Sequence, residues 1–390
     1  MRFQLLVFGL VGAAFTTIYI TQPVLPVLRE EFAVGESRAS LTISAVIFGI
    51  ALSNLPWGSM ADRHPVRPIV LLGGSLIAIC GFACAMTDRI WLLIGIRFVQ
   101  GLFLPCVTTC VAAYLSRTLP QENLNVVMGS YVAATVAGGL GGRLLGGLIH
   151  PPLHWRYAFV TSSVLLEVAA VAAWYFLPRE QGRSQDEEAV GFLRLITRVD
   201  LLRVLWVAFG AFFVFSSMFN YLPFYLATPE LGASTTLTTL MYSSYLIGIV
   251  VGPLSGKLSN RVGNGTTMVA GSAVFGLSIC ATLIPSLPVI AASLAGICAG
   301  FFAIHAAAAG SLNTRLNTSR GRANSLYVLF YYLGGFAGIS AGGYAYVRFG
   351  WSGIAVMGLA MLLVPMGTGV WELINERGLR KGKSPGARSA

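Results

Sequence analysis

Long apolar runs recur along the whole of this 390-residue chain and leave it few ways to fold. Each run is about 20 residues long, the length that a helix needs to cross roughly 30 Å of hydrocarbon. The chain is 55% hydrophobic and only 11% charged, which soluble globular domains do not reach. The pattern predicts an all-α membrane protein with twelve transmembrane helices, near residues 4–27, 40–60, 68–87, 90–114, 124–149, 157–177, 201–226, 236–256, 266–286, 288–312, 322–346 and 351–373.

The two halves of the chain repeat one another. Gly138, Gly142, Gly146, Gly147 and Trp155 match Gly334, Gly338, Gly342, Gly343 and Trp351 at a constant offset of 196 residues. Parallel repeats of this kind are typical of transporters that bind their solute near the midplane, between two bundles. We therefore predict two pseudo-symmetric six-helix bundles at 1–178 and 201–374, a cytoplasmic linker at 179–200 and a basic cytoplasmic tail at 375–390.

The net charge of +11 is explained by topology better than by nucleic-acid binding, because the basic residues lie between the apolar runs. They are concentrated in alternate connections, including the linker and the tail. The positive-inside rule then places both termini in the cytoplasm. The expected location is the cytoplasmic (inner) membrane of a cell.

No enzyme or cofactor signature occurs in the sequence. It contains no ATP-binding loop and no H-E-x-x-H motif. All six cysteines lie inside apolar runs, without histidine or acid at ligand spacing, so we predict no metal site, no cofactor and no enzymatic activity. Energy would come from an ion or solute gradient. An intramembrane enzyme or a sensor stays a remote alternative.

The connection after the second span reads GSMADRHPVRPI. It resembles the loop signature G-x-L-A-D-R-x-G-R-R-x-x-I of the major facilitator superfamily, and GKLSNRVGNG occupies the equivalent place in the second half. The resemblance implies that the aspartate gates the closing of the two halves. The implied gating-loop residues are Gly58, Asp62, Arg63, Arg67, Gly256 and Arg261.

The fourth span contains RFVQG, which resembles the R-x-x-Q-G motif of the same family. Arg97, Gln100 and Thr108 lie on one helical face, which we expect to point inward. The resemblance implies a role for Arg97 in proton coupling or conformational exchange. The alternative is a structural cation that bonds helix ends.

The fifth span, from Gly129 to Gly147, resembles the antiporter motif G-x8-G-x3-G-P-x2-G-G. Its glycines, Gly138, Gly142, Gly146 and Gly147, are implied to contact the other half, and the motif marks exporters that exchange solute for protons. Arg143 stands where the family usually has proline, and its counterpart in the second half is Ile339. A permanent cation in hydrocarbon is costly, so it points to a solute-binding or coupling role, or to a structural hydrogen-bonding one. A narrower resemblance, carried by YITQPVLPVLREEF and GRLLGG among others, is to the YnfM-type bacterial inner-membrane exporters.

Several further polar residues lie within the predicted spans. Glu167 and His305 are candidate proton carriers, since an isolated carboxylate in hydrocarbon is expected to bind a proton and an imidazole titrates near neutral pH. Gln22, Asn54 and Asn220 are candidate cavity groups. An aromatic lining in the second half is predicted from Tyr242, Tyr245, Phe301, Phe302, Tyr327, Tyr331 and Tyr332.

Together these features predict a secondary transporter that works by alternating access. The favoured function is proton-coupled export of a small anionic or zwitterionic organic solute, because Arg97 and Arg143 would make an electropositive path. Efflux of hydrophobic or cationic drugs, and uptake by symport, are the alternatives. The expected partners are a small-molecule substrate, protons and the lipid bilayer, and we expect a monomer.

Overall fold

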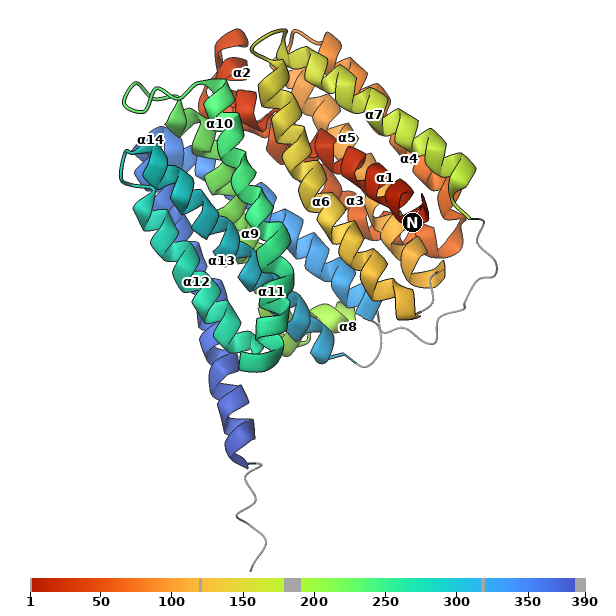
Figure 1. The fold of residues 1–390 in the computed structure, drawn as a ribbon, viewed down its shortest axis with the longest axis vertical. Helices are drawn as coiled ribbons and strands as arrows, with labels where there is room; N and C mark the ends of the chain where they lie inside the picture. The colour runs from red at the N-terminus through yellow and green to blue at the C-terminus, as the bar shows by residue number, and fades with distance from the viewer. Residues whose placement is uncertain (1, 119–120, 179–190, 317–319, 383–390) are drawn as a thin grey trace, which may run out of the picture.

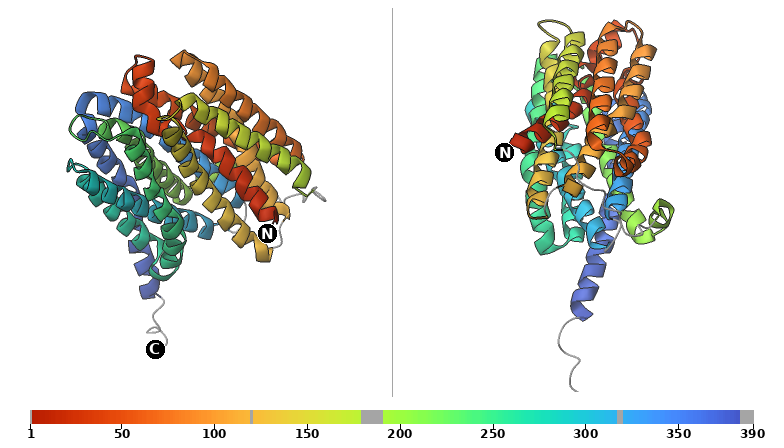
Figure 2. Two further views of the ribbon diagram at one scale, coloured as in Figure 1. Left: turned by 45° about the horizontal axis from the view of Figure 1, so that its top comes forward. Right: turned by 90° about the vertical axis from the view of Figure 1, so that its right-hand side faces the viewer.

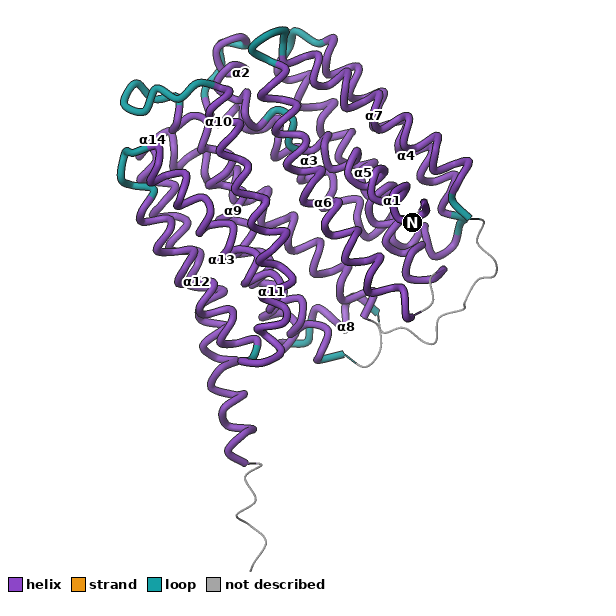
Figure 3. Tube along the Cα trace, viewed as in Figure 1, coloured by secondary structure: helices purple, strands orange, loops and turns teal. Residues whose placement is uncertain are grey.

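The structure, a computed structural model, describes residues 2–118, 121–178, 191–316 and 320–382. These residues form α-helices and short 3₁₀-helices joined by brief loops (Figure 3), and no β-strand occurs among them. The helices of the first half are α1 (Arg2–Ile18), η1 (Gln22–Val24), α2 (Leu25–Glu31), α3 (Glu36–Arg63), α4 (Val66–Met86), α5 (Ile90–Thr118), α6 (Gln121–Ile149) and α7 (Trp155–Phe176). They are followed by α8 (Phe192–Ile196), α9 (Val199–Leu226), α10 (Thr235–Met241), η2 (Tyr242–Tyr245), α11 (Leu246–Val262), α12 (Asn264–Ala281), α13 (Leu287–Thr314) and α14 (Arg320–Gly382).

The described part of the chain contains 11 segments that are long and apolar enough to cross a membrane. The last of them covers 55 residues, Gly321–Asn375, and is interrupted at Gly350, where φ is 62°. A left-handed backbone cannot continue an α-helix, so this segment consists of two crossings. The prediction of an all-α protein with twelve transmembrane helices is confirmed. The final helix is longer than predicted, because α14 continues to Gly382.

Two of the spans are broken by 3₁₀-turns, although each was predicted as a continuous helix. The first is interrupted by η1 between α1 and α2, where Pro23 and Pro26 lack the N–H groups that a continuous helix needs. The eighth is interrupted by η2 between α10 and α11, and η2 contains no proline. Discontinuous helices in transporters often mark a binding site.

The two six-helix bundles lie side by side, one containing α1 to α7 and the other α9 to α14 (Figures 1 and 2). Their internal contacts repeat as the sequence does. Gly138 and Gly142 of α6 lie against backbone of Gly12 and Thr16 in α1, while Gly334 and Gly338 of α14 lie against backbone of Phe209 and Phe213 in α9. A side chain larger than glycine would collide with those backbone atoms. The glycine repeat therefore holds equivalent helix pairs together within each bundle.

The bundles meet along two seams. Helix α3 packs on α14, with Phe48 and Phe336 stacked at 4.4 Å between ring centroids and Asn54 Nδ2 donating to the Ser325 carbonyl at 3.3 Å. Helix α6 packs on α10, η2 and α11, where Gly147 lies against Thr239. The end that includes Gly147 and the start of α3 is called the distal end below; α14 extends from the other end (Figure 1).

Candidate functional site

Arg143 lies on the seam between the bundles and is almost completely buried, at 1% exposure. Its Nε donates to Gln22 Oε1 at 2.6 Å, its Nη1 to the Gly139 carbonyl at 2.7 Å and its Nη2 to Tyr245 Oη at 2.7 Å. Gln22 belongs to the first bundle and Tyr245 to the second. The guanidinium therefore bridges the two halves.

The same guanidinium lies between aromatic rings. Its Cζ is 4.0 Å from the ring centroid of Tyr19, 4.1 Å from that of Tyr245 and 5.3 Å from that of Tyr242. Cation–π contacts of this kind are worth about 2 kcal/mol or more when the cation is desolvated. They let Arg143 stay buried without an acidic partner, and none of the ion pairs among the described residues includes it.

Both interrupted spans supply residues to Arg143. A 3₁₀-helix has three residues per turn, so positions three apart align on one side. In η2 these positions are Tyr242 and Tyr245, and both rings contact the guanidinium. In the other bundle η1 begins at Gln22, which accepts the Nε hydrogen bond. The two helix breaks therefore meet at Arg143 from opposite halves.

Arg143 retains donor capacity. A guanidinium carries five N–H groups, and the three hydrogen bonds above use three of them. Two N–H groups remain, one on each terminal nitrogen, which is the geometry that binds a carboxylate or phosphate in bidentate fashion. The site is chemically suited to an anion that also contacts aromatic surfaces.

The family resemblance implied that the glycines around Arg143 contact the other half of the molecule, and for most of them the structure shows otherwise. Gly138 and Gly142 lie against backbone of α1, and Gly146 lies against backbone of Ile20, in the turn between α1 and η1; of the four glycines only Gly147 contacts the other half, at Thr239. The stripe brings α1 and α6 close enough for Gln22 and Tyr19 to reach Arg143. It builds one wall of the site and does not form the seam itself.

Arg97 is fully buried, but it lies inside the first bundle. Its Nε donates to the Thr42 carbonyl at 3.0 Å, its Nη1 to the Thr17 carbonyl at 2.7 Å and to Gln100 Oε1 at 2.6 Å, and its Nη2 to the Ile18 carbonyl. These partners tie α5 to α1 and α3. Ile18 ends α1, so Arg97 satisfies a carbonyl group at the helix break.

His305 of α13 lies in an aromatic cluster of the second bundle. Its Nδ1 is 3.0 Å from Tyr327 Oη, and its ring stacks on Phe301 at 5.9 Å. Phe301 stacks on Phe215 at 3.9 Å, which meets Tyr245 edge-on at 5.3 Å. A continuous series of ring contacts therefore joins His305 to the tyrosine that holds Arg143.

The other candidate polar residues lie apart from Arg143. Glu167 accepts a hydrogen bond from Ser75 Oγ at 3.0 Å, between α7 and α4. Asn220 of α9 is fully buried, and neither of its side-chain polar atoms has a hydrogen-bond partner in the described part of the chain. Asn54 donates across the α3 seam and also accepts from Thr109 Oγ1 at 2.6 Å.

The gating-loop residues lie at the end of the bundles opposite the distal end. Asp62 is 3.5 Å from Arg117 Nη1, and the Arg67 guanidinium lies 5.4 Å from the Trp174 ring. The Gly58 Cα faces Thr109, whereas Gly256 has open space around it. Arg63 and Arg261 are exposed. The contact between Asp62 and Arg117 joins α3 to α5.

The sequence analysis did not anticipate Tyr19 or the ion pair between Arg315 and Glu372. Tyr19 stands three residues before Gln22, so helical spacing alone would have placed the two on one face. Near the end of α13, Arg315 Nη2 donates to Glu372 Oε1 at 2.6 Å, and Glu372 also accepts from Ser311 Oγ at 2.8 Å. This buried ion pair joins α13 to α14.

The distal end of the first bundle carries a second ionic group. Arg156 Nη1 donates to Glu31 Oε1 at 2.5 Å and its Nη2 to Asp88 Oδ1 at 2.8 Å, which ties α7 to α2 and to the loop after α4. Nearby, desolvation and the neighbouring His154 lower the pKa of His150. No group of three His, Cys, Asp or Glu residues suited to a metal ion occurs among the described residues.

The chain is similar to a known protein family and to several known transport proteins. The family model described as "Major Facilitator Superfamily" matches residues 7–265 and 226–388. The chain is 28% identical over 376 residues to the inner membrane transport protein YnfM of Escherichia coli, covering 94% of this chain and 89% of that protein. It is 26% identical over 358 residues to the multi-drug resistance efflux pump PmrA of Streptococcus pneumoniae, covering 87% of this chain and 88% of that protein.

Among solved structures, the fold is similar to a bacterial homologue of the human lysosomal transporter Spinster in an inward-facing, occupied conformation. The TM-score is 0.77 at 14% sequence identity, over 99% of this chain and 98% of that one. At this identity the similarity concerns the fold alone.

Proposed function

The chain belongs to the major facilitator superfamily and is a membrane transporter, not an enzyme; from this premise we propose that it exports a small anionic or zwitterionic organic solute in exchange for protons. The proposed location is a bacterial inner membrane, with both termini in the cytoplasm and the distal end outside. The inner-membrane relative supports the location, and the basic residues of the linker and of the C-terminal tail support the orientation.

Arg143 is the observation that carries the proposal. It is a buried permanent cation on the seam, it has two N–H donors left, and it contacts both halves. An anion that binds those donors would compensate a charge that the described protein residues leave uncompensated. A solute with an apolar body would also contact the rings of Tyr19 and Tyr245.

Solute binding would also act on the closure of the distal end. The Tyr245 hydroxyl holds Arg143 from the second bundle, so an anion that displaces Tyr245 from the guanidinium breaks a link between the bundles. Because an equilibrium shifts only through a difference in affinity between its states, this exchange supplies the physical basis for coupling binding to opening.

We assign the proton to His305. Of the two carboxylates that we place within spans, Glu372 is paired with Arg315 and Glu167 lies between α4 and α7, away from the seam. Of Glu372, Glu167 and His305, only His305 is linked to Tyr245 by a series of aromatic ring contacts, through Phe301 and Phe215. A second positive charge in this cluster would oppose Arg143, so proton binding would favour release of Arg143 from Tyr245.

The test compares Arg143→Ala with Arg89→Ala in the purified protein. Both variants remove one positive charge, and Arg89 is exposed at the distal end. A panel of organic anions is expected to raise the Tm of the wild type and of Arg89→Ala; saturation at 100 times the Kd corresponds to about 2.7 kcal/mol. Arg143→Ala is expected to show no shift. Anion stabilisation of equal size in Arg143→Ala would overturn the assignment.

The same compounds are then tested for flux in proteoliposomes with an imposed pH gradient. Exchange is expected to depend on the gradient in the wild type and to lose that dependence in His305→Gln. Flux of the solute in the same direction as protons would contradict export and indicate symport.

Drug efflux is the second candidate. The similarity to PmrA and the aromatic cluster around Phe215 and Phe301 favour it. It predicts the opposite ligand profile: lipophilic cations would raise Tm, and Arg143→Ala would strengthen that effect because it removes a repelling charge.

A further inference from the structure

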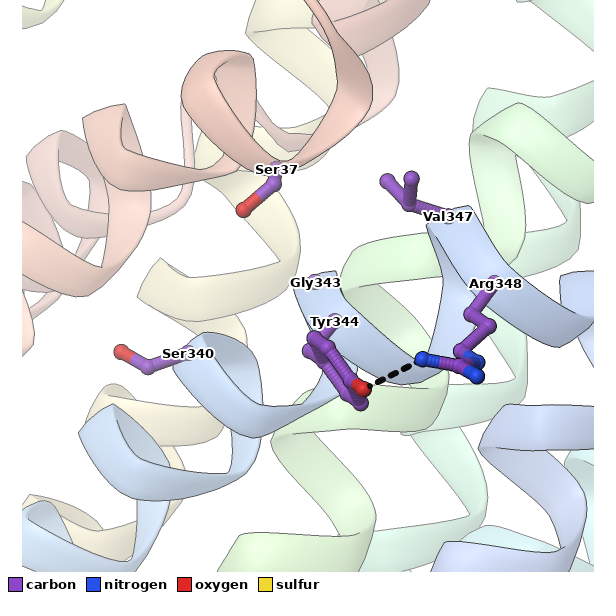
Figure 4. Close-up of a pocket in the computed structure, with 6 residues that line it drawn as sticks. All are labelled: Ser37, Ser340, Gly343, Tyr344, Val347 and Arg348. Carbon is purple, nitrogen blue, oxygen red and sulfur yellow. Dashed lines mark hydrogen bonds between the residues drawn. The ribbon is translucent and has the colours of Figure 1, made fainter.

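A crevice of about 620 Å³ opens at the distal end, between α3 of one bundle and α14 of the other. Ser37 lines it from α3, and Ser340, Gly343, Tyr344, Val347 and Arg348 line it from α14 (Figure 4). Gly343 allows this close approach, because a Cβ at that position would collide with Ser37. The crevice therefore belongs to the seam, but it is separate from the α6 side on which Arg143 lies.

The crevice lies at the depth of lipid headgroups. Helix α3 begins at Glu36, and α14 changes direction at Gly350, so both crossings end beside the crevice. The large apolar side chains around it are exposed: Tyr344 at 66%, Val347 at 64% and Phe349 at 62%. Exposed aromatic residues at the ends of spans are typical of the membrane–water interface.

The rim of the crevice is cationic. Arg348 Nη1 donates to Tyr344 Oη at 2.9 Å (Figure 4), which orients the guanidinium and uses one of its five N–H groups. Arg38, next to Ser37, lies 5.3 Å from the centroid of the Trp91 ring. The neighbouring carboxylate, Glu36, already accepts from Arg29 at 3.0 Å. The oriented Arg348 guanidinium therefore lines the crevice together with the hydroxyl groups of Ser37 and Ser340 and the exposed side chain of Val347.

We propose that this crevice binds a glycerophospholipid with an anionic headgroup, from the leaflet at the distal end. Arg348 binds the phosphate and Ser37 and Ser340 contact the glycerol and headgroup oxygens. An acyl chain lies along the exposed apolar face of Val347. Phosphate and guanidinium pair in bidentate fashion, and the position among exposed apolar side chains selects a lipid over a water-soluble anion.

Because the crevice has one wall in each bundle, a lipid in it contacts both halves. It would stabilise the arrangement in which the distal ends of α3 and α14 are close. The lipid composition of the membrane would then alter the transport rate without any contact at Arg143.

The experiment measures phospholipid retained by the purified protein, by native mass spectrometry after exchange into mixed micelles of phosphatidylglycerol and phosphatidylcholine. The wild type is expected to retain phosphatidylglycerol preferentially, and Arg348→Ala to lower that retention about tenfold, the change expected for one charged hydrogen-bonded contact. Lys257→Ala, which removes an exposed cation at the opposite end, is the matched control and is expected to behave as wild type.

Three outcomes would overturn the proposal. They are equal retention in Arg348→Ala and wild type, an equal loss in Lys257→Ala, and equal retention of the two lipids by the wild type. Thermal stabilisation by inorganic phosphate alone, lost in Arg348→Ala, would also contradict it, because it would identify a water-soluble anion as the ligand. Anion stabilisation through Arg143 is measured in lipid-free detergent, so the two sites are tested independently.

Discussion

Arg97 and Arg143 are both buried arginines on transmembrane helices, and their partners differ in kind. Arg97 donates to the carbonyl groups of Thr17, Ile18 and Thr42, which are fixed parts of one bundle. Arg143 donates to two side chains, from different bundles, that can rotate away. We therefore infer a structural role for Arg97 and a functional one for Arg143.

Substitution of Arg97 should accordingly act on stability. Arg97→Met leaves the carbonyl groups of Thr17 and Ile18, at the end of α1, without a partner and is expected to cost about 3 kcal/mol, measured as a lowered Tm, with transport by the remaining folded protein unchanged. Arg89→Met is the control. A variant with the Tm of wild type that has lost proton exchange would instead establish the coupling role that the family resemblance implies.

The sequence predicted that both arginines matter, because a permanent cation in an apolar run needs an explanation. It could not distinguish their roles. The Thr17 and Ile18 carbonyl groups that accept from Arg97 are 80 and 79 residues away along the chain and become available only because α1 stops at Ile18. Likewise Tyr245 meets Arg143 only through the packing of η2 on α6.

Among the helices, the close pairing of α1 with α6 depends on glycine. Gly142 lies against the backbone of Thr16, whereas Gly95 of α5 has no atom of a neighbouring helix within 4 Å of the place that a Cβ would occupy. These two glycines allow a matched comparison, because both lie within helices and differ in the space around them.

Gly142→Ala is expected to lower stability by about 1–3 kcal/mol through overpacking. Gly95→Ala is expected to raise it by up to about 1 kcal/mol, since alanine favours the helix. Tm in a single detergent reports both. An unchanged Tm in Gly142→Ala would mean that α1 and α6 can separate freely, and it would remove the rigid wall behind Arg143.

Element boundaries could be predicted where the local sequence determines them. The break at η1 could have been predicted, because Pro23 lacks the N–H group that a continuous helix needs. Our prediction nevertheless treated this span as continuous. The break at η2 has no such signal. Its residues, YSSY, are compatible with a helix, so the 3₁₀-turn depends on contacts with the other bundle.

For the whole molecule, the constant offset between halves was enough to predict two equivalent bundles. The seam was not predictable, because it joins residues far apart in both repeats. Gly147 and Thr239, on α6 and α10, mark the seam at the distal end, beyond Arg143.

A covalent link at that position tests whether the distal end must open. Gly147→Cys with Thr239→Cys, in a background without the six native cysteines, is expected to abolish transport on oxidation and to regain it on reduction. Each single variant is the control for the effect of the substitution itself. Full transport by the cross-linked protein would show that the bundles do not separate there.

The charge of Arg143 has no counterpart at Ile339, and this gives the transporter an electrical asymmetry. In the exchange that we propose, the carrier returns without solute, with the positive charge of Arg143 and the proton on His305 both inside the membrane field; a bound monovalent anion would cancel the charge of Arg143 on the loaded step. Moving one charge through the whole field changes the energy by about 2.3 kcal/mol per 100 mV, and a partial movement by a fraction of this. We therefore expect the membrane voltage to act mainly on the return of the protonated, solute-free carrier and to have little effect on the step that carries the anion.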